Sequence, residues 1–213
     1  MDKKREILVV ERGKIFDEGY FQGFVTNGIF DFSDKILANY LYLERNNELE
    51  NNVDYLQVIP YVWVVNKKKG IFVYKRAVGA GEYKEERHID RYSAGVGGHI
   101  DSDTEENSAN PVLDAADREL KEELIMENYP SSEFIGYIND DSDIYNAVHF
   151  AVVALAETSE ENIKPNDGMK SGRFYSIEEF ESLMKDKSVE VENWTRLSWP
   201  FVKTHLTELK QSF

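Results

Sequence analysis

The sequence predicts an α/β domain in which a mixed β-sheet lies between helices. Segments rich in β-branched and aromatic residues alternate with segments whose apolar residues recur at helical spacing. Their order is strands, hairpin, glycine-rich strand, helix, strands, helix and helix, which is typical of such a layered arrangement. The chain has 213 residues, of which 41% are hydrophobic, so it can bury one sizeable core. We therefore expect one domain with elaborations.

Residues 1–55 are predicted to form an N-terminal extension that packs on a core domain of residues 56–213. Ile7–Val10 is expected to be a short strand, and the aromatic, glycine-rich stretch Phe16–Phe30 suggests turns around a packed loop. Ser33–Arg45 has the apolar spacing of an amphipathic helix. Whether the extension covers the core, completes a sheet or makes a dimer stays open.

A β-hairpin is predicted at the start of the core domain. Leu56–Val65 is rich in β-branched and aromatic residues, Asn66–Gly70 has the composition of a turn, and Ile71–Ala77 returns as the partner strand. Pro60 lacks a main-chain N–H and therefore suggests an edge position or a bulge.

The helix expected to carry chemistry begins at Asn110, a good N-cap, followed by Pro111 at the first helical position. The helical pattern continues to about Met126. At roughly 100° per residue, Glu119, Glu122 and Glu123 share one stripe. The core-facing side lies directly beside these acids, and it consists of Leu113, Ala116, Leu120 and Leu124.

Three carboxylates so close together repel one another unless a cation lies among them. Mg²⁺ or Mn²⁺ is the natural partner of an all-oxygen cluster. The alternative is an ordinary solvated face of an amphipathic helix in a chain that is 31% charged. The preceding segment Gly95–Ile100 favours a site, because its three glycines suggest that a backbone or ligand approaches closely.

The segment Gly97-Gly98-His99-Ile100-Asp101, a helix, and the run Arg118-Glu119-Leu120-Lys121-Glu122-Glu123-Leu124 together resemble the Nudix box. The family pattern is glycine, five residues, glutamate, seven residues, then Arg-Glu-apolar-x-Glu-Glu-x-Gly-apolar. The resemblance implies that Glu119, Glu122, Glu123 and the main-chain carbonyl of Gly98 bind divalent cations. It also implies that Arg118 orients Glu119.

The chain departs from the family pattern at three places. Arg118 lies 20 residues after Gly98 where the pattern has 14, which places an insertion of six in the loop 103–109. The isolated glutamate of the box would correspond to Asn110 or to Thr104, beside Glu105 and Glu106. Ile125 stands at the late glycine of the box.

The C-terminal half is predicted to add two strands and two helices. Glu133–Ile138 and Ile144–Ala156 read as strands around an acidic turn. Ser176–Glu179 is a capping box that opens a helix to about Lys185. A last helix is expected from Asn193, with Pro200 as a kink or interruption in its early part.

The remaining polar candidates have weaker support. Histidine 99 should lie at the rim of the pocket, and His149 is expected to be a hydrogen-bonded core or pocket residue. Arg87 and Arg91 are candidates for phosphate contacts, or are simply exposed. The cluster Asp140–Asp143 is expected to be a solvated turn, because it lacks the other ligands of a calcium loop. Besides Glu119, the candidates for the general base are Glu157, Glu160, Glu161 and Asp167.

Composition limits the partners. The net charge of −15 argues against broad binding to nucleic acid or to an anionic membrane. No stretch has the roughly 20 apolar residues that span a bilayer, and the run Ile7–Val10 is too short for a signal-peptide core. The absence of cysteine fits a reducing compartment. We therefore expect a cytoplasmic protein, with homodimer formation left open.

Two functions follow as hypotheses from the resemblance. The first is metal-dependent hydrolysis of a diphosphate bond in a nucleoside diphosphate linked to another group. The second is a non-catalytic nucleotide-binding or scaffold protein, which the departures at Ile125 and at the isolated glutamate favour. A third and weaker hypothesis, an isomerase of isoprenoid diphosphates, is opposed by the absence of cysteine.

Overall fold

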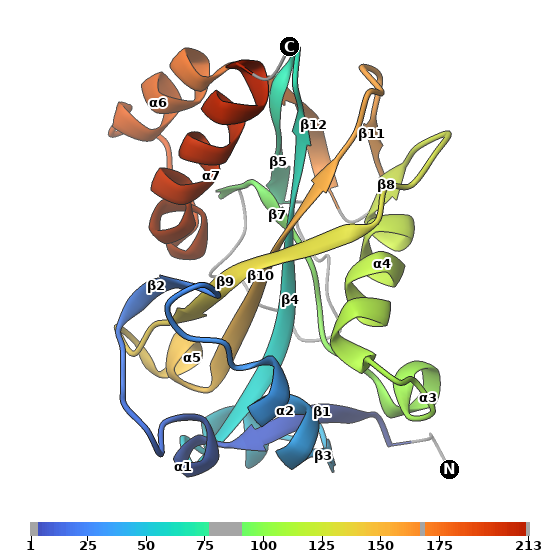
Figure 1. The fold of residues 1–213 in the computed structure, drawn as a ribbon, viewed down its shortest axis with the longest axis vertical. Helices are drawn as coiled ribbons and strands as arrows, with labels where there is room; N and C mark the ends of the chain where they lie inside the picture. The colour runs from blue at the N-terminus through green and yellow to red at the C-terminus, as the bar shows by residue number, and fades with distance from the viewer. Residues whose placement is uncertain (1–3, 77–90, 167–168, 212–213) are drawn as a thin grey trace. The chain divides into compact units, whose positions relative to one another are not determined.

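The computed structural model describes residues 4–76, 91–166 and 169–211. It contains two compact units. The first unit comprises Met1–Tyr61, Gly97–Ala116 and Phe134–Ala154, and the second comprises Val62–Val96, Asp117–Glu133 and Leu155–Phe213. The predicted α/β class, a sheet with helices, is confirmed (Figure 1).

The first unit is built on antiparallel strands. Strand β1 (Glu6–Glu11) pairs with β3 (Tyr40–Glu44) and with β4 (Tyr55–Asn66), while β2 (Gly23–Thr26) pairs with β9 (Ser132–Asn139). Strand β10 (His149–Glu157) lies between β4 and β9 in the strand order. The helices here are short: α1 (Arg12–Ile15), α2 (Ser33–Asn39), the 3-10 helix Leu49–Asn51, α3 (Ser102–Glu105) and α5 (Ile144–Ala147).

Aromatic side chains fill the core of this unit. Phe32 packs edge-on against Tyr137 and Phe150, with ring centroids 5.0 and 5.6 Å apart, and Phe16 lies 6.1 Å from Phe150. The apolar side chains of β1 and β4 complete the cluster. The packed loop predicted at Phe16–Phe30 is confirmed in part: Phe16 packs on the core, whereas Tyr20, Ile29 and Phe30 are exposed and Gly23–Thr26 forms strand β2.

Two predictions of regular structure were wrong in part. The helix predicted for Ser33–Arg45 ends at Asn39, because Tyr40–Glu44 pairs with β1 as a strand. Residues Tyr-Leu-Tyr-Leu satisfy the spacing of a helix face and also the β propensity of a strand, so the pairing decides. The strand predicted for Ile144–Ala156 begins as helix α5, capped by the Asp143 side chain, which accepts from the Asn146 N–H. The strand itself begins at His149.

The second unit contains the predicted hairpin of β4 and β5 (Gly70–Arg76). The Asn66 side chain accepts hydrogen bonds from the main chain of Lys68 and Lys69, and Gly70 has a φ of +100°, which favours glycine. Strand β12 (Met169–Tyr175) pairs with β5 along its length. Short strands β6 (Tyr92–Ser93) and β7 (Gly95–Val96) pair with β5 and β4.

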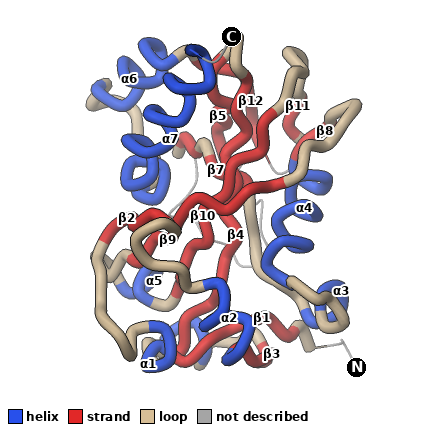
Figure 2. Tube along the Cα trace, in the orientation of Figure 1, coloured by secondary structure: helices blue, strands red, loops and turns tan. Residues whose placement is uncertain are grey.

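Helices α6 (Ile177–Lys185) and α7 (Asn193–Gln211) lie side by side in this unit (Figure 2). The predicted capping box at Ser176 and Glu179 is present. Phe180 of α6 packs edge-on against Trp199 of α7, which stacks on Trp63. Of the two predictions for Pro200, the interruption is wrong, because α7 continues through it, and the kink stays a prediction. A proline removes one main-chain donor, and the rest of the helix is held by its packing.

The prediction offered an edge position or a bulge for Pro60, and the edge position is wrong. Pro60 belongs to β4, which has β5 and β10 as neighbours in the strand order. Pro60 falls between Tyr55–Gln57, which pair with β1, and Val62–Trp63, which pair with β7. The missing N–H thus lies where the partner strand changes. Gly97 lies here too, and a Cβ on Gly97 would come within 1.8 Å of the Pro60 carbonyl oxygen.

We expect Gly97→Ala to lower the free energy of unfolding by about 1–3 kcal/mol or more, because the added methyl group has no room beside the Pro60 carbonyl. Chemical denaturation measures the change. Gly13→Ala is the matched control, since a Cβ there meets nothing within 4 Å, and it should be neutral or slightly stabilising. Equal stability of the two variants would contradict the close approach.

Candidate metal and diphosphate site

Helix α4 (Pro111–Glu123) carries the predicted acidic residues. Its start is as predicted, since the Asn110 side chain accepts from the Leu113 N–H at 3.2 Å. The buried face contains mainly small and apolar side chains together with one acid, Glu119: Val112, Ala115, Ala116, Glu119 and Leu120. Lys121 is exposed, while Asp117 is half-exposed and its side chain accepts from the Ser132 N–H.

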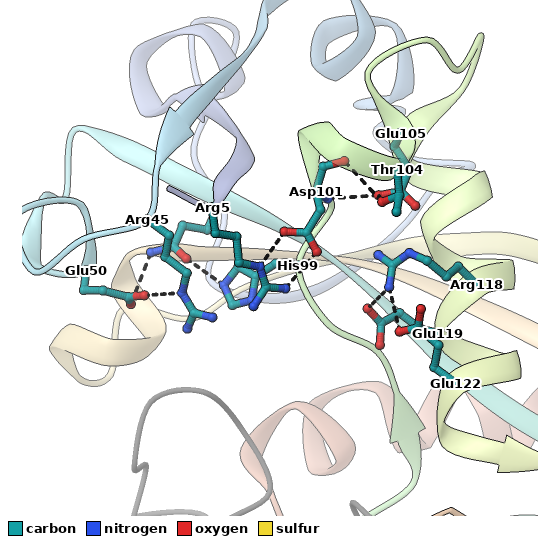
Figure 3. Close-up of polar contacts among 11 residues, drawn as sticks. Arg5, Arg45, Glu50, His99, Asp101, Thr104, Glu105, Arg118, Glu119 and Glu122 are labelled. Atoms are coloured by element: carbon teal, nitrogen blue, oxygen red, sulfur yellow. Dashed lines mark hydrogen bonds and ion pairs between the residues drawn. The ribbon is translucent and has the colours of Figure 1, made fainter. Parts of the chain in front are cut away.

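Arg118 joins two of the three acids. Its Nη1 donates to Glu119 Oε1 at 2.7 Å and to Glu122 Oε2 at 2.9 Å (Figure 3). The exposed fraction of the side chain is 8% for Glu119, 18% for Arg118 and 57% for Glu122. The arginine therefore connects a buried carboxylate to an exposed one. Arg118 thus pairs with Glu122, one helical turn away, as well as with the adjacent Glu119.

Burial raises the pKa of Glu119 to about 7, and the charge and hydrogen bond of Arg118 oppose this rise. Desolvation also raises the pKa of Glu123, and the positive charge of Arg76 opposes it. Both carboxylates lie in poorly hydrated surroundings, and this desolvation is the main cause of both shifts. A cation beside them would favour their ionised form.

Arg76 was not among the predicted site residues. It lies at the end of β5, and its Nε donates to Glu192 Oε1 at 2.5 Å, with only 8% of the Glu192 side chain exposed. No sequence spacing could indicate that the positive charge of Arg76 acts on Glu123, because only the fold brings the two residues together.

Helix α4 ends earlier than the predicted Met126. Leu124–Ile125 forms strand β8, which pairs with β11 (Lys164–Pro165). The Asn166 side chain donates to the Glu122 carbonyl at 2.8 Å, and its main-chain N–H donates to the Glu123 carbonyl at 2.8 Å. Ile125 therefore needs no glycine-like turn at this position, since Asn166 satisfies the last carbonyls of the helix.

The donor chemistry of Glu119, Glu122 and Glu123 fits a hard divalent cation, because all three offer carboxylate oxygens from one helix. Among the residues that the structure describes, no group of three acids or histidines has its side chains already gathered around one point. Arg118 holds two of the three acids. Binding of a cation by all three would therefore require their side chains to turn from these partners.

The predicted ligand Gly98 belongs to the first unit. Next to it, His99 Nε2 lies 2.8 Å from Gln57 Oε1. Burial of His99, together with the positive charges of Arg45 and Arg5, holds its pKa well below the usual value. This supports a neutral, hydrogen-bonded histidine. The predicted hydrogen bond of His149 is present as well, between Nδ1 and the Tyr145 carbonyl at 2.7 Å.

The candidates for the isolated box glutamate have local partners. Asn110 caps α4. In the inserted loop, Glu105 is buried, and its Oε2 accepts from the Asp101 N–H at 2.9 Å and from the Thr104 hydroxyl at 2.6 Å (Figure 3). Glu105 thus closes the helical turn α3. Glu106 is exposed.

The candidate bases in the loop after β10 also have partners. Glu157 pairs with His205, and Glu161 pairs with Lys69. Glu160 accepts from the N–H groups of Glu127 and Asn128, which lowers its pKa. Asp167 and Arg87 lie outside the described residues.

Two polar predictions remain, Arg91 and the acidic cluster 140–143. Arg91 pairs with the exposed Glu190. In the acidic turn, Asp140 is buried and accepts from Gln22, while Asp143 caps α5. The turn is therefore hydrogen-bonded, and only part of it is solvated as predicted.

Comparison with known proteins identifies the class. The model of the NUDIX domain matches residues 56–197. The crystal structure of Tm1382, which is assigned to the Nudix hydrolases, superposes with a TM-score of 0.71 at 26% identity, covering 95% of this chain and 99% of that chain. Among curated proteins, the comparison gave no match.

More distant structures share the fold. The NUDIX domain of Shewanella oneidensis NrtR in complex with ADP ribose gives a TM-score of 0.51 at 11% identity, covering 72% of this chain and 88% of that chain. A bifunctional NMN adenylyltransferase/ADP ribose pyrophosphatase of Francisella tularensis, in complex with AMP and a manganese ion, gives 0.50 at 12% identity. The match covers 71% of this chain and 42% of that chain.

Fold and helix chemistry define a Nudix-type pyrophosphohydrolase, an enzyme that hydrolyses phosphoric anhydrides. The chain belongs to the Nudix family, as the resemblance predicted. Every helix described in the structure is too short or too polar to cross a membrane.

Glu119→Gln should stabilise the metal-free protein at high pH. The pKa of Glu119 is about 7 in the folded protein and about 4.5 when unfolded, so between these values the folded state binds a proton that the unfolded state releases. The contribution of Glu119 to stability therefore falls as pH rises through that window. With EDTA present, the variant should gain up to about 3 kcal/mol over wild type at pH 8 and little at pH 4.5.

Thermal unfolding at both pH values measures this difference. Glu127→Gln is a suitable control, because Glu127 is exposed and lies just beyond the same helix. A gain of equal size at pH 4.5 and pH 8 would mean that burial of the Glu119 charge is not its cause.

Proposed function

We propose that the protein hydrolyses the diphosphate bond of a nucleoside diphosphate linked to another group, with Mg²⁺ or Mn²⁺ as cofactor. The observation that carries the proposal is Arg118, which bridges a buried and an exposed carboxylate on the helix that matches the Nudix box. Its pairing with Glu119 supports the orienting role that the resemblance implies.

The cation would be held by Glu119, Glu122, Glu123 and the main-chain carbonyl of Gly98. When bound, it supplies neutralisation of the diphosphate charge and a lowered pKa of water. Arg118 keeps Glu119 in position, and Arg76 adds positive charge beside Glu123. Glu119 is the proposed proton acceptor, because it lies on the acidic helix and the described loop acids are engaged with other partners.

The substrate class is supported by the distant relatives. The NrtR domain binds ADP ribose, and the Francisella tularensis protein binds AMP and manganese. We therefore propose a nucleotide derivative as the substrate of this chain. A small anionic substrate is also compatible with a net charge of −15 if metal ions supply the local positive charge.

The organisation proposed for the whole chain is an extension of residues 1–55 on a Nudix domain of residues 56–213. The family model, which begins at residue 56, supports this boundary. We further propose a cytoplasmic location, supported by the absence of cysteine, and leave open a homodimer. Nucleic acid and membrane are not proposed as partners, in view of the net charge of −15.

We expect Glu122→Gln to reduce kcat at least 100-fold, because it removes one proposed carboxylate ligand, while the melting temperature stays within about 2 °C of wild type. The small thermal effect follows from the 57% exposure of the side chain. Phosphate-containing products are measured over a panel of nucleoside diphosphate derivatives with Mg²⁺ or Mn²⁺. EDTA should abolish the activity of the wild type reversibly.

Glu127→Gln is the matched control and should keep full activity, since this acid lies outside the box. If the wild type binds nucleotides, seen as a rise in melting temperature, but cleaves none of them with either metal, the hydrolase proposal fails. The non-catalytic nucleotide-binding hypothesis would then hold.

A further inference from the structure

Residues of the N-terminal extension contact the C-terminal end of the segment Gly97–Asp101, at Ile100 and Asp101. Arg5 Nε donates to Asp101 Oδ1 at 2.5 Å, and Arg5 Nη2 donates to Asp101 Oδ2 at 2.8 Å (Figure 3). The Leu8 N–H donates to the Ile100 carbonyl at 2.8 Å, and Ile7 and Asp101 form an antiparallel bridge. Strand β1 and a two-point ion pair therefore fix Asp101 through both its main chain and its side chain.

A second connection reaches His99 from the same extension. Arg45 Nε donates to Glu50 Oε1 at 2.6 Å, and Glu50 Oε2 accepts from the buried Gln57 side chain at 3.4 Å. Gln57 Oε1 lies 2.8 Å from His99 Nε2. Only 9% of the Arg45 side chain and 17% of the Glu50 side chain are exposed, so this chain of polar contacts is largely shielded from water.

The other end of the segment is fixed by Gly97, which leaves no room for a Cβ beside the Pro60 carbonyl. Gly98 stands between these restraints. A glycine loses more conformational freedom on ordering than any other residue, so its main-chain direction depends on its neighbours. The contacts of Gly97, His99 and Asp101 restrict the main chain of Gly98. Asp101 is bound by Arg5 of the extension, and His99 is bound by Gln57, which contacts Glu50 of the extension.

We infer that Arg5 is a positioning residue, which orders the segment Gly97–Asp101 so that the Gly98 carbonyl is available to the metal ion. The inference rests on the proposed function, because Gly98 is a ligand only in that proposal. Arg5 is suited to the role, since a guanidinium binds a carboxylate at two points and fixes its orientation as well as its charge. The exposed fraction is 34% for the Arg5 side chain and 18% for Asp101, so water competes only in part.

The test compares Arg5→Ala, Arg5→Lys and Lys4→Ala in the full chain. Lys4 is the matched control, because it is the adjacent cation and its ion pair with Glu44 leaves 74% of the lysine side chain exposed. Mn²⁺ binding is followed by electron paramagnetic resonance without substrate, at a temperature well below each melting temperature. Amide hydrogen exchange of residues 98–101 is followed without metal.

Loss of a charge-assisted pair is expected to weaken Mn²⁺ binding roughly tenfold in Arg5→Ala and to speed exchange at Ile100 and Asp101. Arg5→Lys should be intermediate, because lysine keeps the charge without the fork. Lys4→Ala should match the wild type. If Arg5→Ala binds Mn²⁺ with the same affinity as Lys4→Ala, the inference is overturned. This holds even if Arg5→Ala melts at a lower temperature, because a purely structural role of Arg5 predicts lower stability with unchanged Mn²⁺ affinity.

The outcome for the inference can be separated from that for the proposed hydrolysis. If Arg5→Ala weakens Mn²⁺ binding but the wild type cleaves no substrate, only the hydrolysis fails. If the wild type binds no Mn²⁺, both the ligand role of Gly98 and the inference are overturned. If Mn²⁺ binding and turnover fall together in Arg5→Ala while KM at saturating Mn²⁺ is unchanged, the positioning role is supported.

Discussion

The guanidinium of Arg118 between two carboxylates of its own helix is the interaction on which the rest of the site depends. Glu119 lies on the buried face of α4, where an uncompensated charge would be costly. Arg118 favours the ionised form of this carboxylate, because it supplies both a positive charge and a hydrogen bond. The same Arg118 nitrogen also donates to Glu122, so it connects the buried carboxylate of Glu119 to an exposed one. Two acids of the helix are thereby held by one arginine.

Sequence patterns predicted what is local and missed what is distant. The β4–β5 hairpin, the start of α4 at Asn110 and the capping box of α6 all follow from neighbouring residues, and all are present. Tyr40–Glu44 was assigned to a helix because its short apolar run fits two periodicities, and only the pairing with β1 decides. The ion pairs Arg76–Glu192 and Arg5–Asp101 join residues 116 and 96 positions apart, so no local pattern could have indicated them.

Charge balance explains why the predicted cations matter in so acidic a chain. The arginines beside the helix acids, Arg76 and Arg118, are both engaged with carboxylates. Their positive charge is therefore largely neutralised by carboxylates of the protein itself. A polyphosphate would meet a net charge of −15, and divalent ions are the simplest means of reversing the local field. The same reasoning makes metal affinity and substrate affinity interdependent in the proposed enzyme.

The loop between Gly98 and α4 is held by hydrogen bonds at both of its ends. Asp101 accepts from the main chain of Thr104 and Glu105, and the buried Glu105 carboxylate returns to the Asp101 N–H. Ser108 of the loop contacts the start of α4, because its hydroxyl accepts from the Asn110 N–H and donates to Asp114. A change in the length of this connection is therefore expected to disturb hydrogen bonds at both of its ends, at Asp101 and at Asp114.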